Sequence, residues 1–121
     1  MSASQDEIGT LTSKMLKLKL YVILWHGKDQ DLLPLLPDHL AYLISLEKQG
    51  KVFASGPLGA PEKRNGLTIV RAKDEAEARQ MAENDPFAKA GIRDFSIEPW
   101  TIMEGSISIR MDFSDCTGSL T

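Results

Sequence analysis

Alternation of apolar and polar positions predicts five strands. In residues 15–26 (MLKLKLYVILWH) the leucines share one face, and the second half is apolar on both faces, around Tyr21, Ile23 and Trp25. Pro99 falls near the end of the fourth predicted strand and indicates an edge strand or a bulge. The fifth, within GSISIRMDF, alternates throughout and is expected to be half-buried. The remaining strands are predicted at residues 51–57, 67–72, 92–100 and 105–113.

Helical spacing of apolar residues predicts two helices. The first spans residues 36–51, begins with Pro37 and Asp38, and carries an apolar stripe that we expect to be buried. The second begins at the capping residue Asp74 and ends at Asp85. The residues at helical spacing are Leu36, Leu40, Leu43, Ile44 and Glu47, and the apolar members of this set form the stripe.

The order βαββαβ, with one further strand, predicts an α+β protein of the ferredoxin-like type. Strands one and three would lie in the middle of an antiparallel sheet, with both helices on one face. The other face would expose the apolar residues of the first strand. We therefore expect a homodimer in which sheet packs against sheet, as a dimeric α+β barrel, with a higher oligomer also compatible. The fifth strand would extend the sheet or cross to the partner.

The chain of 121 residues suits one domain with extensions at both ends. We place a flexible N-terminal tail at residues 1–14 and the domain at residues 15–100. A C-terminal strand extension follows at residues 101–115, and residues 116–121 form a second tail.

Charge and composition narrow the possible functions. A net charge of −3 offers no basic excess for nucleic acid, and the apolar run at residues 20–25 is too short to span a membrane. Without an export signal, a cytoplasmic location is expected. Cys116 is the single cysteine, and two histidines with scattered acids form no metal signature, so we predict neither metal nor cofactor. Arg71 and Arg93 are expected to be solvated, although either could hold an anionic ligand.

The predicted topology brings polar segments together at one edge of the sheet. The end of the first strand, the start of the first helix, and the ends of the second strand and second helix all lie there. A small-molecule site is therefore predicted at this edge. The segments carry Trp25, His26, Pro37-Asp38-His39, Ser55-Gly56-Pro57 and Asn84-Asp85-Pro86-Phe87.

His39 and Asp85 are the predicted catalytic pair. A carboxylate facing the imidazole would fix which ring nitrogen carries the proton, and such a histidine can act as a general acid and base. Trp25 and Phe87 would form apolar walls, and Gly56 would let a ligand approach the backbone closely. The other predicted substrate-binding residues are His26, Ser55 and Pro57.

The spacing leaves structural roles open for the same residues. Asp85 would serve equally as a turn residue that bonds its own backbone. His39 could be a surface residue in a first helical turn. Trp25 and Phe87 also suit a core or an interface, and Gly56-Pro57 also suits a turn.

Three segments resemble the YCII-related family of small proteins: LYVILWHG, PDHLAYLISLEKQGKVFASGPL and AENDPFAKAGIRDFSIEPW, over residues 18–100. The most specific parts are the histidine of PDHLAYL, the ASGP motif and the NDPFAKAG segment. The resemblance implies a dimeric α+β barrel and an active site built on a His and an Asp, here His39 and Asp85. A characterised relative is similar to a lyase that removes chloride from a chlorinated hydroxyhydroquinone. The wider superfamily includes lactone isomerases and cofactor-free monooxygenases.

Two functions follow as expectations. The first is a cofactor-free enzyme, similar to a lyase (dehydrochlorinase) or an isomerase, that moves a proton on a small cyclic or aromatic substrate through His39 and Asp85. The alternative is a non-catalytic ligand-binding or accessory dimer module with the same cleft. The fold alone does not decide between them, because function belongs to the site.

Overall fold

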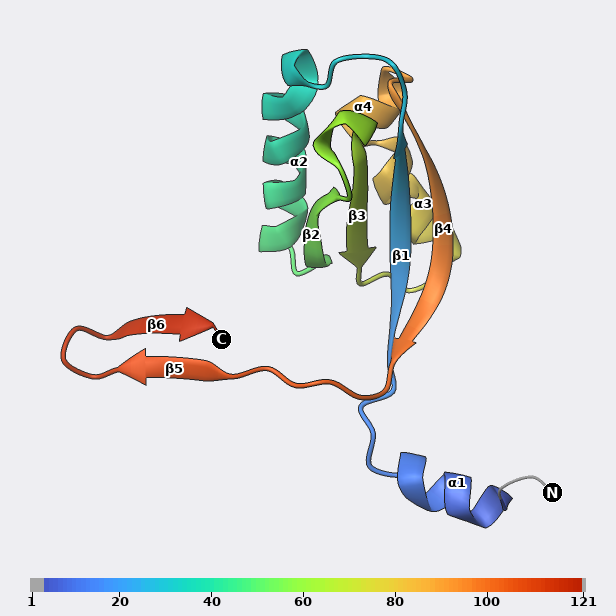
Figure 1. Ribbon diagram of the computed structural model, residues 1–121, viewed down its shortest axis with the longest axis vertical. Helices are drawn as coiled ribbons and strands as arrows, with labels where there is room; N and C mark the ends of the chain where they lie inside the picture. Colours follow the sequence, from blue (N-terminus) through green and yellow to red (C-terminus); the bar gives the residue numbers. More distant parts are fainter. Residues whose placement is uncertain (1–3, 121) are drawn as a thin grey trace. The chain divides into compact units, whose positions relative to one another are not determined.

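The computed structural model describes residues 4–120, which divide into two units. One is a compact domain over residues 19–101, and the other comprises the residues before and after it. The elements of the chain are shown in Figure 1. They are α1 (Gln5–Thr12), β1 (Leu18–Gly27), η1 (Leu33–Leu35), α2 (Leu36–Lys48), β2 (Val52–Leu58), η2 (Pro61–Lys63), β3 (Asn65–Val70), α3 (Glu75–Glu83), α4 (Pro86–Lys89), β4 (Arg93–Ile102), β5 (Ile109–Asp112) and β6 (Thr117–Leu120).

The domain has the predicted ferredoxin-like topology. Its sheet has the order β2-β3-β1-β4, so the first and third strands are central. Strand β3 runs antiparallel to both of its neighbours, and its register pairs Val70 with Tyr21 and Gly66 with Trp25 of β1. Pro99 lies in β4, an edge strand, as its position in the sequence indicates. The α+β prediction is therefore confirmed.

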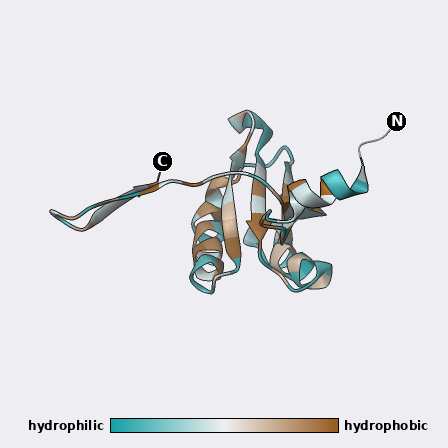
Figure 2. Cartoon of the chain, turned by 90° about the horizontal axis from the view of Figure 1, so that it is seen from below, coloured by the Kyte–Doolittle hydropathy of each residue, from teal (hydrophilic) through white to brown (hydrophobic). Residues whose placement is uncertain are grey.

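Helices α2 and α3 cover the same face of the sheet. Hydrophobic and hydrophilic residues alternate along both helices in Figure 2, as expected for elements that cover a core. Asp74 caps α3 by accepting a hydrogen bond from the Glu77 amide at 2.9 Å. The core on this face contains Tyr21, Ile23 and Trp25 of β1, Val70 of β3, Leu46 of α2, Ala78, Met81 and Ala82 of α3, and Ile97 of β4.

The apolar stripe of α2 is only partly buried, whereas we expected a buried stripe: Leu36 and Leu43 are half-buried. Leu40 and Ile44 are 48% and 51% exposed, whereas the buried residues of this helix are His39 and Leu46. Periodicity shows which residues share a helix face, but it does not show what lies opposite that face. Here the stripe lines a cavity, and Leu43 also packs against the core.

A short helix that the sequence did not predict, α4, follows α3. Asp85 is its N-cap, and the Asp85 Oδ1 atom accepts a hydrogen bond from the Phe87 amide at 2.9 Å. Asp85 therefore begins a helix and does not close the previous one. Its carboxylate lies where the helix dipole favours negative charge, and Pro86 occupies the first helical position.

The segment predicted as an N-terminal tail contains α1. Ser4 caps this helix through a hydrogen bond from the Glu7 amide at 3.0 Å, and none of the helix residues is buried. Residues 1–3 of the predicted tail, and Thr121 of the C-terminal one, lie outside the described residues. None of the helices in the described chain is long and apolar enough to cross a membrane.

The predicted fifth strand pairs with β6 in a hairpin and does not join the four-stranded sheet. The register pairs Ile109 with Leu120 and Asp112 with Thr117. The prediction of a half-buried strand is wrong for the single chain, because a two-stranded ribbon supplies no second layer to cover its apolar face. The exposed apolar residues are Ile107, Ile109, Met111, Phe113 and Leu120.

Candidate active site

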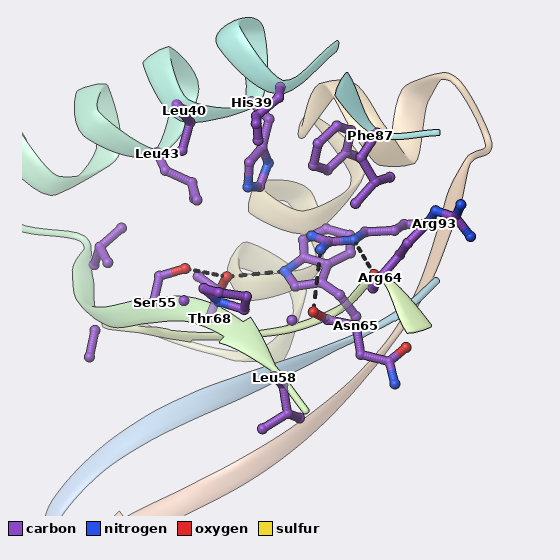
Figure 3. Close-up of a pocket in the computed structure, with 18 of the residues that line it drawn as sticks. His39, Leu40, Leu43, Ser55, Leu58, Arg64, Asn65, Thr68, Phe87 and Arg93 are labelled. Atoms are coloured by element: carbon purple, nitrogen blue, oxygen red, sulfur yellow. Dashed lines mark hydrogen bonds between the residues drawn. The ribbon is translucent and has the colours of Figure 1, made fainter. Parts of the chain in front are cut away.

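A cavity of about 690 Å³ lies between α2 and the β2–β3 side of the sheet (Figure 3). The apolar stripe of α2 forms one wall, and strand β2 from Val52 to Leu58 forms another. The volume is in the range of small-molecule sites, and the mostly apolar walls with a few polar groups are typical of such sites. The polar side chains along it include His39, Ser55, Asn65, Thr68 and Arg93.

The structure brings His39 and Asp85 together. The Nδ1 atom of His39 lies 2.7 Å from the Oδ2 atom of Asp85, and the two residues are 7% and 1% exposed. The other oxygen of Asp85 accepts the Phe87 amide hydrogen bond. The turn role and the pairing role, which the sequence left as alternatives for Asp85, are thus filled by different oxygens of one carboxylate.

The contact with Asp85 sets the proton arrangement on His39. An ionised carboxylate only accepts hydrogen bonds, so the hydrogen in this contact is on Nδ1. In the neutral ring Nε2 is then the basic nitrogen. Within residues 4–120 no hydrogen bond occupies Nε2, and the ring lines the cavity. The pair therefore presents a proton acceptor to whatever fills the cavity.

Phe87 fixes the plane of the His39 ring. The two rings stack with centroids 4.3 Å apart and an interplanar angle of 19°, and Phe87 is 1% exposed. The guanidinium of Arg93 lies 4.9 Å from the centroid of the same phenyl ring. Phe87 lines the cavity, and it also belongs to the packed interior.

Arg93 lines the cavity, whereas the sequence analysis favoured a solvated side chain and left a role in anion binding open. It is buried, and its Nε donates to the Arg64 carbonyl at 2.9 Å. Burial lowers the pKa of Arg93, and the negative charge of Asp85 partly opposes this. A signal was available, since strand alternation places Arg93 on the same face as Phe95 and the core residue Ile97.

A chain of hydrogen bonds crosses the sheet side of the cavity. The Trp25 indole donates to the Thr68 hydroxyl at 3.1 Å, and the hydroxyls of Thr68 and Ser55 lie 2.8 Å apart. The sequence analysis missed Thr68, although a hydroxyl within the apolar strand LTIV requires a partner. Gly56 and Pro57 also line the cavity, so Trp25 and the predicted Ser55-Gly56-Pro57 segment lie along it.

His26 lies away from this cavity. Successive side chains of a strand point to opposite faces, so His26 faces away from its neighbour Trp25. It is exposed, and its Nε2 lies 3.2 Å from the Ser96 hydroxyl of β4. The shared sheet edge predicted its position along the strand correctly but did not distinguish the two faces.

Tyr42 connects α2 with α3 close to the His–Asp pair. Its hydroxyl donates to the Met81 carbonyl at 2.7 Å. Burial raises the pKa of Tyr42, and the negative charge of Asp85 raises it further.

In the described part of the chain, residues 4–120, no three His, Cys, Asp or Glu side chains gather as metal ligands.

Comparison with known proteins gives a family and a similar solved structure. The family model of the YCII-related domain matches residues 19–101, which is more than half of the chain. The chain is also similar to the solved structure of 5-chloro-2-hydroxyhydroquinone dehydrochlorinase from Burkholderia phenoliruptrix in complex with 2,5-dihydroxybenzoquinone. The identity is 29% over 67% of this chain and 92% of that one, with a TM-score of 0.54. No curated protein matches significantly. The chain therefore belongs to the YCII-related domain family.

Proposed function

We propose that the protein is a cofactor-free enzyme in which His39 and Asp85 act as a general acid–base pair on a small cyclic or aromatic substrate. The 2.7 Å contact between His39 Nδ1 and Asp85 Oδ2, beside a cavity of about 690 Å³, carries the proposal. It leaves the basic Nε2 atom for a substrate proton. The buried carboxylate would stabilise the imidazolium that forms when this proton is taken.

The reaction class supported best is the elimination of an acid HX. On a chlorinated hydroquinone, the ring carbon that bears the leaving group first gains a proton while one hydroxyl group loses its own, which gives the keto tautomer. His39 Nε2 then takes the proton of a second hydroxyl group, and the released electron pair passes through the ring and expels the leaving group, such as chloride, with the electrons of its bond to carbon. The imidazolium later returns its proton to water. In an isomerisation no leaving group departs: the electron pair stays in the substrate, and the imidazolium returns the proton to another substrate atom. Neither route requires an oxidant.

The similar dehydrochlorinase favours elimination over isomerisation. By its printed name, that protein acts on a chlorinated hydroxyhydroquinone, and its structure holds a dihydroxybenzoquinone. Rings of that size suit a cavity with apolar walls and a few polar groups. We therefore propose halogenated or otherwise activated hydroquinones as the first substrates to test.

The test is chloride release from 5-chloro-2-hydroxyhydroquinone. We expect His39→Gln to reduce the rate by about 10²–10⁴-fold, the usual contribution of a general base. His26→Gln is the matched control, because His26 is exposed and does not line the cavity. Equal rates in the wild-type protein and the His39→Gln variant would rule out His39 as the base.

A non-catalytic ligand-binding or accessory module is the second candidate. The exposed apolar rim of the cavity, with Leu40, Ile44 and Phe53 about half exposed, favours binding of an apolar ring whether or not chemistry follows. Calorimetric binding of 2,5-dihydroxybenzoquinone, together with no turnover of any substrate tested, would favour this candidate.

We also propose a homodimer that packs sheet against sheet. The face of the sheet opposite α2 and α3 has a shallow hollow of about 360 Å³ lined by Val22, Leu67, Ile69 and Trp100, and Trp100 is 41% exposed. A second copy related by a two-fold axis would bury the same patch on both chains. Sedimentation of Trp100→Glu should then report a monomer, whereas Met111→Glu in the hairpin should remain dimeric. Dissociation by the second variant alone would place the interface on the hairpin.

A further inference from the structure

We infer that Arg93 binds a negatively charged oxygen of the substrate, so that the site selects ring compounds that carry an ionised hydroxyl group. The inference rests on the proposed function and specifies its substrate class. Arg93 would be a binding residue that contacts the substrate directly, together with His39.

The hydrogen-bond donors of Arg93 are only partly used by the protein. A guanidinium has five N–H donors. In Arg93, Nε donates to the Arg64 carbonyl at 2.9 Å and Nη2 donates to the Asn65 carbonyl at 3.4 Å. These backbone carbonyls hold the plane of the group. Within residues 4–120 no hydrogen bond uses Nη1, yet no buried side-chain nitrogen in this part lacks a partner. Nη1 is therefore accessible to solvent, and Arg93 lines the cavity.

The protein supplies no direct counter-ion for this cation. In the described residues, 4–120, no carboxylate forms a salt bridge with Arg93. Asp85 is close enough to influence the Arg93 pKa, but its two oxygens already contact His39 Nδ1 and the Phe87 amide. A buried charge without a partner is costly, and an anionic ligand would offset that cost.

Arg93 and His39 are positioned to hold one ring between them. Both contact Phe87, with His39 4.3 Å and the Arg93 guanidinium 4.9 Å from the phenyl centroid. Figure 3 shows Arg93 reaching into the cavity on the side of the sheet, with His39 entering from α2. Gly66 makes room for this arrangement, because a Cβ atom there would lie 3.2 Å from Nη1.

The placement suits the chemistry of conjugated hydroxyl groups. When His39 takes a proton from a hydroxyl group that is conjugated with a carbonyl, as in a hydroxyquinone or the keto tautomer of a hydroquinone, the negative charge is shared with the carbonyl oxygen. A fixed guanidinium at that oxygen would stabilise the charge as it develops. Substrates that are already ionised at one hydroxyl would be bound by the same contact. Neutral rings of equal size would lose it.

The experiment compares two probes by calorimetry at neutral pH. One is 2,5-dihydroxybenzoquinone, which is anionic there, and the other is hydroquinone, which is neutral. We expect Arg93→Gln to weaken binding of the anion about tenfold or more, the usual cost of losing a charge-assisted hydrogen bond. Binding of hydroquinone should be nearly unchanged. Arg79→Gln is the matched control, since Arg79 is exposed and stacks on Phe95, which does not line the cavity.

Two results would contradict the binding role of Arg93. Equal weakening of both probes by Arg93→Gln would indicate a merely structural role and overturn the inference, as would a wild-type protein without preference for the anion. If Arg93→Gln does not fold, Arg93→Lys decides. Reduced affinity for the anion alone supports the contact, because lysine keeps the charge but loses the planar fork. Unchanged affinity refutes it. Anion binding lost in Arg93→Gln while the wild type shows no turnover would leave this inference standing and reject only the enzyme.

Discussion

The Asp85 carboxylate lies 2.7 Å from Nδ1 of His39, across 46 positions of sequence, while its other oxygen caps α4. Capping holds the carboxylate in place without using the oxygen that faces the histidine. The proton on His39 is thereby directed to Nδ1, and the basic nitrogen to the cavity.

Asp85→Asn should preserve the fold and move the ring proton of His39 from Nδ1 to Nε2. Asparagine is as good an N-cap as aspartate, so the bond from the Phe87 amide should survive. Its amide group would donate to Nδ1 and move the ring proton to Nε2, which then no longer accepts a substrate proton. Nitrogen NMR shifts of the two His39 ring atoms measure this directly. A wild-type protein with the proton already on Nε2 would contradict the assignment.

Phe87→Leu should reduce activity beyond its effect on stability. Phe95→Leu is the matched control, because Phe95 also contacts a neighbouring aromatic ring, that of Trp25 at 5.5 Å, and an arginine. Each variant should lower the free energy of unfolding in urea by about 1–2 kcal/mol. Only Phe87→Leu frees the His39 ring plane, so only it should slow chloride release, by about 10–100-fold. Equal rates in both variants would show that the stacking does not orient the base.

Tyr42→Phe should change how stability depends on pH. At neutral pH the lost hydrogen bond to Met81 should cost about 0.5–1.5 kcal/mol. The pKa of Tyr42 is raised in the folded state, so its contribution is fully present below the unfolded pKa near 10 and is lost as the pH rises through the folded pKa. The difference between wild type and variant should therefore shrink above about pH 10. Urea unfolding from neutral to alkaline pH checks this, and a constant difference would contradict it.

Gly27→Ala should destabilise the domain strongly. A Cβ atom at this position would lie 2.1 Å from the carbonyl oxygen of Lys63, which is backbone and cannot move aside as a side chain does. We expect the free energy of unfolding to fall by about 1–3 kcal/mol or more, which would be measured as a lower Tm. Gly56→Ala is the control, because a Cβ there meets nothing within 4 Å. Similar Tm values for the two variants would mean that the loop at η2 shifts freely.

The topology of the domain was predictable because its signals are local. Strand alternation and the capping residue Asp74 define the elements, and right-handed crossovers then leave the order β2-β3-β1-β4. Burial was less predictable, since it depends on what lies opposite. The apolar face of α2 meets a cavity, and the alternating segment around Ile109 forms its own hairpin. In both segments the sequence pattern of apolar and polar residues is the same as that of an element packed on a core.

The candidate site was predictable where topology alone determines proximity. His39 and Asp85 lie at the helix ends that the ferredoxin-like topology brings to one edge. The burial of Arg93 was not predicted, because a charged side chain was expected to be solvated, although Arg93 alternates in register with Ile97. His26 shows the converse limit, because a position at the correct edge does not fix the face of the sheet.

The His–Asp contact joins the two halves of the split fold. His39 belongs to the β1–α2–β2 half, while Asp85 and Arg93 belong to the half formed by β3, α3, α4 and β4. Neither half contains a complete site. Two fragments separated within the exposed η2 connection would each be inert, and the reacting groups would meet only on reassociation. Recovery of turnover would then measure how many fragment pairs have reassembled correctly, whereas helical or strand content would not distinguish correct from incorrect pairs.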